Sequence, residues 1–238
     1  MRKQWFLLSF WLFPFFCLAD ASKQSICPVH SVLFVGDSIT RHGEQPSIGW
    51  LHTAGMAAST SEKDYVHLFL DDLTDNYSCG PVDFDINTAG GAGALNDRVD
   101  STIALLKKKK YSLVVVQLGE HDVTPNGAAD FRARYKNFLR LIKSEQASIG
   151  IACIGLWMPY RSSEENKKYT GIAADYTDAI SSACRESNGV YVDVSDIAGD
   201  LSKRGSGESN GVKWHPNDQA HKIYAQRLMR SFKQLNIK

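Results

Sequence analysis

Residues 31–40, SVLFVGDSIT, constrain the fold most, because an apolar run stops there at a Gly-Asp-Ser turn. A run rich in Val, Leu and Phe is typical of a central parallel strand, since helices cover both faces of such a strand. Ser38 would then follow the carboxyl end of the strand, where open α/β sheets place their ligand sites. The run therefore predicts a buried strand that delivers one serine to the edge of a sheet. A loop serine without chemical duty is the alternative.

The rest of the chain alternates apolar runs with helical patterns. Further strands are expected at Val82–Thr88, Ser112–Leu118, Ile149–Trp157 and Val190–Val194. Apolar residues at spacings of three and four predict helices between them, one starting near Ser61, and a closing helix from about Ala220. This alternation predicts fold class α/β, a three-layer α/β/α sandwich with a five-stranded parallel sheet. A flavodoxin-like strand order, 2-1-3-4-5, is expected.

The first 21 residues have the anatomy of a secretory signal peptide. Two basic residues precede an apolar run of 14 residues, Trp5–Leu18, and the small residues of Ala-Asp-Ala at 19–21 offer a cleavage site. A membrane anchor is the alternative, but a spanning helix needs roughly 20 apolar residues. We therefore expect a signal peptide at 1–21, one domain at 22–238, and a secreted or periplasmic protein.

The expected mature chain carries no net charge. Without Arg2, Lys3 and Asp20, the 27 basic and 26 acidic residues become 25 of each. Neutrality gives no electrostatic reason to expect nucleic acid or an anionic membrane as a partner. We expect no stable membrane insertion after signal cleavage, and the sequence leaves the oligomeric state open.

A second motif, WHPNDQAH at 214–221, leads into the expected closing helix. Together with GDSIT at 36–40, it resembles the SGNH (GDSL-type) hydrolases, a family of serine esterases and acyl hydrolases. The resemblance covers most of the chain after about residue 30. It implies that Ser38 is the nucleophile and His215 the general base. A serine hydroxyl needs such a base, and donors for the oxyanion, because it is a poor nucleophile near neutral pH.

The remaining cysteines are Cys27, Cys79, Cys153 and Cys184. An even count in an exported protein suggests disulfides. Cys27 and Cys79 each precede an expected strand, and these strands are neighbours in the expected order, so we pair them. Cys153 and Cys184 either form a second disulfide or stay as buried thiols. No Cys/His spacing typical of zinc occurs, so we expect neither a structural metal nor a cofactor.

The resemblance also implies an oxyanion site built from three donors. These are the backbone N–H of the nucleophile, a glycine after the second strand, and an asparagine in a Gly-x-Asn-Asp block after the third. The small-residue turn at 89–93 supplies Gly93 as the better match by its Gly-x-x-Gly spacing, and Gly90 as the lesser one. A glycine lets a substrate oxygen approach the backbone closely. A tight turn without catalytic duty is the alternative.

The third block departs from the family pattern, because it reads Gly-Glu-His-Asp at 119–122. His121 stands where asparagine is expected, yet an imidazole N–H can also donate to an oxyanion. A related branch, the PC-esterase-like proteins, uses a similar Gly-x-His-Asp block. We assign His121 to the oxyanion site. The alternatives are a pH-sensitive or metal-contacting residue and a structural hydrogen bond, while Asp122 is expected to hold the turn.

The acid of the usual triad is also missing. Family members carry aspartate three residues before the histidine, and Val212 occupies that position here. Neutralising the acid costs roughly 10⁴ in rate in the serine-protease example, because the histidine tautomer is then wrong. A backbone carbonyl in the 210–213 turn could fix the tautomer instead. We therefore favour a Ser-His dyad, with Asp193 or Asp196 as less favoured acids.

Segments within 49–67 resemble a bacterial branch of SGNH proteins that is often associated with carbohydrate esterases. Trp50, Trp157 and Trp214 could stack on sugar rings, although core packing is the commoner role of tryptophan. The loop after Ser38 holds no long apolar stretch, which argues against a lipid groove.

The sequence thus predicts a serine esterase that removes acetyl or another small acyl group from a carbohydrate through an acyl-enzyme. The alternatives are a lipolytic or thioesterase acyl hydrolase, an O-acetyltransferase of the same family, and a non-catalytic carbohydrate-binding domain.

Overall fold

The computed structural model describes residues 29–77, 80–159, 163–207 and 209–235. Within them, a five-stranded sheet has the order β2-β1-β3-β4-β5, and every neighbouring pair is parallel. The strands are β1 Ser31–Gly36, β2 Asp83–Asn87, β3 Leu113–Gln117, β4 Gly150–Ile154 and β5 Val190–Val192. The predicted fold class and strand order are confirmed.

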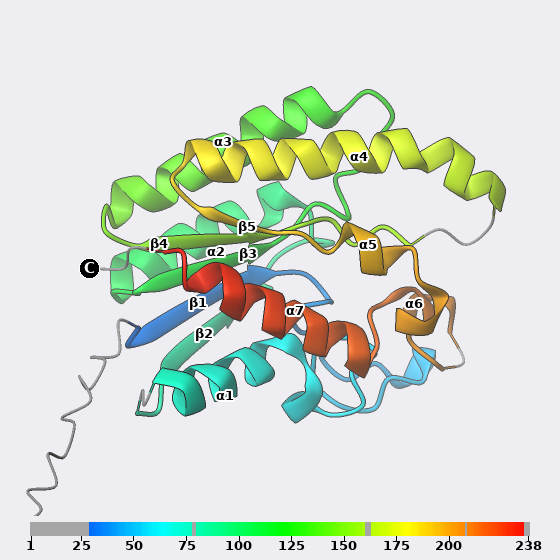
Figure 1. The fold of residues 1–238 in the computed structure, drawn as a ribbon, viewed down its shortest axis with the longest axis horizontal. Helices are drawn as coiled ribbons and strands as arrows, with labels where there is room; N and C mark the ends of the chain where they lie inside the picture. The colour runs from blue at the N-terminus through cyan, green and yellow to red at the C-terminus, as the bar shows by residue number, and fades with distance from the viewer. Residues whose placement is uncertain (1–28, 78–79, 160–162, 208, 236–238) are drawn as a thin grey trace, which may run out of the picture.

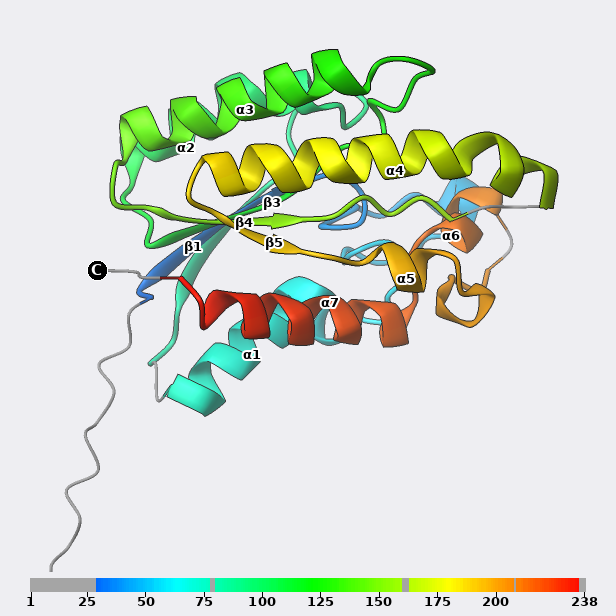
Figure 2. The same cartoon turned by 45° about the horizontal axis from the view of Figure 1, so that its top comes forward.

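Helices cover both faces of the sheet and complete the three layers (Figures 1 and 2). One face is covered by α1 Tyr65–Tyr77 and α7 Asp218–Phe232, and the other by α2 Leu95–Lys108, α3 Ala128–Glu145 and α4 Ser163–Glu186. Among the described residues, five short helices lie in the connections: η1 Pro46–Ile48, η2 Ser61–Lys63, α5 Ser195–Ala198, η3 Leu201–Lys203 and α6 Asn210–Trp214. No described helix combines the length and apolar composition that crossing a bilayer requires.

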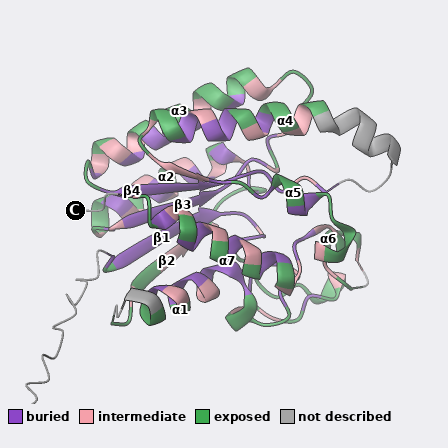
Figure 3. Cartoon of the chain, viewed as in Figure 1, coloured by how far each residue is buried: buried purple, intermediate pink, exposed green. Residues whose placement is uncertain are grey.

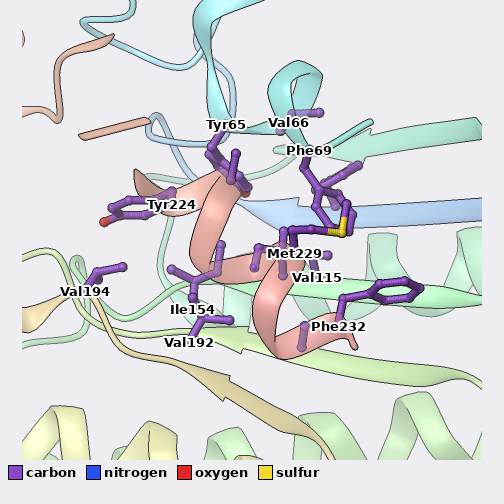
Figure 4. Close-up of a cluster of buried hydrophobic side chains, with 14 of the residues drawn as sticks. Tyr65, Val66, Phe69, Val115, Ile154, Val192, Val194, Tyr224, Met229 and Phe232 are labelled. Carbon is purple, nitrogen blue, oxygen red and sulfur yellow. The ribbon is translucent and has the colours of Figure 1, made fainter. Parts of the chain in front are cut away.

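Each central strand contributes side chains to two separate cores. In β1, Val32 and Phe34 pack toward α1 and α7, while Leu33 and Val35 pack toward α2 and α3, because successive side chains of a strand point to opposite faces. The central strands and the inward faces of the helices are therefore buried (Figure 3). Figure 4 shows the first core, where residues of α1 and α7 meet strand residues such as Val115. Burial on both faces explains the unbroken apolar run with which β1 was recognised.

Several element ends differ from the expected ones because tertiary contacts decide them. Strand β4 ends at Ile154 rather than Trp157, since the Trp157 N–H donates to the Glu120 side chain (2.8 Å) and no longer to a strand. Helix α1 begins at Tyr65 rather than near Ser61. The Asp64 carboxylate accepts the His67 N–H (3.0 Å) and so caps the helix.

A disulfide joins Cys153 of β4 to Cys184 of α4. This settles the choice between a cross-link and two buried thiols. The other predicted pair, Cys27 and Cys79, lies outside the described residues, as do the expected signal peptide at 1–21 and its cleavage site.

Candidate active site

Ser38 and His215 meet at the carboxyl edge of the sheet. Ser38 lies in the turn after β1, His215 follows α6, and Ser38 Oγ lies 2.7 Å from His215 Nε2. The other ring nitrogen, Nδ1, lies 2.6 Å from the carbonyl oxygen of Gly211. A carbonyl only accepts hydrogen bonds, so Nδ1 carries the proton and Nε2 is free to accept the serine proton. A backbone carbonyl in the 210–213 turn therefore fixes the tautomer.

Capping interactions hold the segment that carries His215. The Ser209 hydroxyl accepts the Val212 N–H (3.1 Å) at the start of α6, and Asn217 Oδ1 accepts two N–H groups at the start of α7. The His215 carbonyl accepts the Gly205 N–H at 2.7 Å. These short-range contacts fix both sides of the histidine, as expected for Ser and Asn at helix N-termini.

A clamp between loop 41–64 and helix α7 closes the same region. Asp218 Oδ1 accepts the Ser59 N–H (2.6 Å), Asp218 Oδ2 accepts the Ser59 hydroxyl (2.8 Å), and Lys63 Nζ lies 3.2 Å from that carboxylate. The Tyr65 N–H donates to His221 Nδ1 at 3.2 Å. The chain after Ser38 is thus tied to the helix that follows His215.

The two less favoured acids are engaged elsewhere. Asp193 Oδ1 accepts the Ser195 N–H (2.9 Å), and Asp196 forms a two-pronged ion pair with Arg227. In the described part of the chain, the acceptor recorded for His215 Nδ1 is the neutral Gly211 carbonyl. Ser38 and His215 therefore form a hydrogen-bonded pair that a neutral backbone carbonyl orients.

Burial sets the protonation of His215. It lowers the pKa of the imidazole to about 4, and the hydrogen bond to Gly211 offsets only part of this effect. His221, His42 and His121 lower the pKa further by repelling the charged form. The ring is therefore neutral, and able to accept a proton, throughout the neutral pH range.

A cavity of about 450 Å³ opens over the serine. Its lining includes Ser38, Arg41, His42, His121, Gly211 and His215. The side chain of His121 is 42% exposed, and its Nε2 lies 3.8 Å from Asp37 Oδ2. The structure therefore brings His121 into the same cavity as Ser38 and His215.

The Gly93 amide is already engaged. It donates to Asp97 Oδ2 (3.1 Å), which also accepts the Ala94 N–H. The residue has φ +108°, and a Cβ there would lie 2.9 Å from His121 Cδ2, so the position requires glycine. Gly90, the lesser match, has its carbonyl bound by Arg98.

A buried charged group beneath the serine turn escaped the sequence analysis. Arg98 of α2 donates from Nε to the Gly36 carbonyl (2.8 Å) and from Nη1 to the Ala89 and Gly90 carbonyls. It thereby ties the end of β1 to the turn after β2. The available signal was an arginine one turn after Leu95 on the inward side of an amphipathic helix.

Two buried carboxyl groups also lie beneath the serine. Burial raises the pKa of Asp37 to about 6, although the Ile39 N–H donates to its Oδ1 at 2.9 Å. Burial, and then repulsion by Asp37, raise the pKa of Glu120 well above its usual value. Both residues lie within the sequence blocks at 36–40 and 119–122, but nothing in the pattern marked them as buried.

Asp122 has the structural role expected of it. Its Oδ2 accepts the Leu95 N–H (2.8 Å) at the start of α2, and its Oδ1 accepts from Arg134 (2.9 Å). Among the tryptophans, Trp157 and Trp50 are buried, so core packing is their role rather than stacking on sugars. Trp214 is partly buried and stands edge-on to the His215 ring. Within the described ranges, no group of three His, Cys, Asp or Glu side chains is placed to hold a metal ion.

Comparison with known proteins gives a consistent result. A family model described as the GDSL-like lipase/acylhydrolase family matches residues 34–223. No curated protein matches the sequence.

Solved structures share the fold, and three of them serve as examples. A GDSL-like lipase from Parabacteroides merdae has a TM-score of 0.61 and 15% identity, with 86% of this chain and 96% of that chain covered. An SGNH hydrolase from Slackia heliotrinireducens has a TM-score of 0.57 and 17% identity, with 85% of this chain and 98% of that chain covered. A mutant of an acetyl-xylooligosaccharide esterase from Geobacillus stearothermophilus has a TM-score of 0.58 and 18% identity, with 88% of this chain and 96% of that chain covered.

Proposed function

This chain belongs to the GDSL-like lipase/acylhydrolase family, and from that premise we propose that it is a serine esterase that removes acetyl or another small acyl group from a carbohydrate. The observation that carries the proposal is the 2.7 Å contact between Ser38 Oγ and His215 Nε2 at the floor of a cavity. Family membership makes the protein a hydrolase of ester bonds. The substrate and the roles of individual residues are our proposal.

The reaction would run in two halves on this geometry. Ser38 Oγ attacks the ester carbonyl while His215 Nε2 takes its proton, and the resulting oxyanion is stabilised by N–H donors. His215 then returns the proton to the departing sugar oxygen, which leaves an acyl-enzyme. Water attacks the acyl carbonyl in the second half, with His215 again as base, and Ser38 is restored.

We assign the oxyanion to the Ser38 N–H, His121 and Gly93. His121 lines the cavity with the dyad, and a Cβ at Gly93 would touch its ring, so both groups border the same space. The Gly93 N–H would exchange Asp97 Oδ2 for the substrate oxygen. The missing acid would be replaced by the Gly211 carbonyl, which orients the imidazole without adding charge.

A carbohydrate substrate is supported by the fold relatives and by the site. One structural neighbour is an acetyl-xylooligosaccharide esterase, and the cavity lining mixes charged, polar and few apolar residues. We further propose that residues 1–21 are a signal peptide and 22–238 the mature domain, so that the enzyme acts in the periplasm or outside the cell. An O-acetyltransferase would pass the same acyl group to a second sugar instead of water.

The acyl-chain preference tests the small-acyl assignment. We expect kcat/KM to be at least about tenfold higher for 4-nitrophenyl acetate than for the decanoate ester, because the lining offers no long apolar surface to bury extra methylene groups. The two rates are measured side by side, with Ser38→Ala as the blank. A preference for the long chain would replace this assignment with a lipolytic one. Equal background rates for wild type and Ser38→Ala would favour the non-catalytic carbohydrate-binding alternative.

The pH profile tests the dyad. The base must be neutral, so activity falls as pH drops through the pKa of His215, and we expect the acidic limb of kcat/KM near pH 4. A histidine paired with a carboxylate would give a limb at 6.5 or above. The profile is measured on an acetate ester from pH 3.5 to 8, with circular dichroism at each pH as the control for unfolding.

Asp37 could produce a limb of its own, since burial raises its pKa to about 6. The profile is therefore repeated with Asp37→Asn. A limb near 6 that disappears in this variant belongs to Asp37, and one that stays at 6.5 or above contradicts the dyad.

A further inference from the structure

A second cavity lies beside the one over Ser38, and the two share a residue. The second cavity has about 320 Å³, and its lining includes Phe84, His67, Asp64 and Ala54. Arg41 lines both cavities. Since Arg41 comes three residues after the nucleophile, the shared wall lies close to the reacting serine.

The same two segments form walls of both cavities. From β2 and its end, Phe84 and Ile86 line the second cavity and Thr88 lines the first. From the loop after Ser38, Ala54 lines the second and Met56 the first. The two cavities therefore adjoin at Arg41, and together they offer more room than an acetyl group needs. We call the two adjoining cavities the cleft.

An exposed aromatic ring marks the second cavity. Phe84 is 37% exposed although it belongs to a strand. The His67 ring stands edge-on to it at 5.9 Å, and His67 Nδ1 lies 2.8 Å from Asp64 Oδ1, which fixes the pair. A fixed, partly exposed ring surrounded by polar side chains offers a packing surface to the C–H face of a sugar ring.

Arg41 is the charged group at the junction. It is exposed, and no ion pair is recorded between it and a described residue. Asp64, the carboxylate that lines the second cavity with Arg41, is engaged by the Gly55 N–H (3.1 Å) and by His67. The other arginine of the first cavity, Arg98, is bound to backbone carbonyls. Arg41 is therefore the guanidinium in this cleft with donors to spare for a ligand.

We propose that the cleft binds an oligosaccharide in which a sugar next to the acylated one carries a carboxylate, and that Arg41 binds this carboxylate while Phe84 packs against the sugar. A guanidinium forms two parallel hydrogen bonds to a carboxylate, a geometry that hydroxyl groups do not reproduce. The inference rests on the proposed esterase function, because it extends the substrate of the same site.

Binding without turnover tests the subsite. In the Ser38→Ala protein, tetragalacturonate is expected to bind about tenfold more tightly than the same oligomer with its carboxyl groups methyl-esterified, because esterification removes the charge and keeps the sugar. Adding Arg41→Gln should abolish this difference, and Arg41→Lys should keep only part of it. Arg140→Gln, on the opposite helical layer, is the matched control and should leave the difference unchanged. Affinities are measured by calorimetry at two salt concentrations, since the Arg41-dependent part should shrink with salt.

A second variant separates the sugar contact from the charge contact. Phe84→Ala should weaken binding of the acidic and the esterified oligomer by the same factor. Equal binding of the two oligomers, or an Arg41→Gln protein that behaves like Arg140→Gln, overturns the inference. An active esterase with either result keeps its proposed function and loses this substrate class. A wild type that is inactive as an esterase but binds the acidic oligomer through Arg41 keeps this ligand class and loses the proposed esterase function.

Discussion

Replacement of His215 by alanine is expected to lower kcat for an activated acetate ester by about 10⁴-fold or more, as much as Ser38→Ala does. The imidazole Nε2 is 2.7 Å from Ser38 Oγ, and without it the hydroxyl has no base to accept its proton. Two residues that act as one unit fail together, so the double variant should lose no more than either single one. The measurement is kcat on 4-nitrophenyl acetate, with circular dichroism to show that each variant is folded.

The matched controls are Asp193→Asn and Asp196→Asn. Each is expected to cost less than about tenfold, against the roughly 10⁴ that follows neutralisation of a true triad acid. Asp196 is paired with Arg227, so its replacement should affect stability more than turnover. A loss near 10⁴ at either aspartate in a folded protein would reveal a relocated triad and refute the dyad.

Removal of the Cys153–Cys184 cross-link is expected to lower the free energy of unfolding by about 3–4 kcal/mol. The disulfide closes a loop with a sequence separation of 31, and the entropy that such a link removes from the unfolded chain gives this magnitude. Both cysteines are buried, so the double alanine variant also loses packing. For a domain of this size the midpoint of thermal unfolding should fall by about 10 °C.

Reductant provides the control for this measurement. Wild type should lose stability when reduced, whereas Cys153→Ala with Cys184→Ala should respond only to the extent that another disulfide exists. Cys27→Ala with Cys79→Ala is the matched pair and tests the cross-link predicted between those positions. Equal melting of wild type and the Cys153/Cys184 double variant would show that the link contributes nothing.

The fold was predictable because its strands are buried on both faces. An unbroken apolar run such as 31–36 avoids water only when both of its faces are covered, as they are in the middle of an α/β sheet. Element ends were less predictable, because distant side chains decide them. The Glu120 side chain accepts the Trp157 N–H, so the chain leaves the sheet before Trp157. No pattern within β4 itself contains that information.

The residues of the candidate site were likewise predictable only in part. Ser38 and His215 stand in sequence blocks with a recognisable pattern, and the Gly211 carbonyl falls in the turn where an acceptor was expected. Arg98 and Asp37 could not be found in this manner, because a charged residue in a sequence is expected to be solvated. Their burial follows from carbonyls and amides that come together only in the folded chain. For the same reason, the engagement of the Gly93 amide by Asp97 was not foreseen.

The clamp between Ser59 and Asp218 has a consequence for the order of events during synthesis. Ser38 lies in the turn after β1 and His215 in the segment before α7, a separation of 177 residues. A nascent chain that has emerged only as far as β5 holds a serine without a base and a loop without its anchor. The dyad that we propose can therefore form only after the segment that carries His215 has been synthesised.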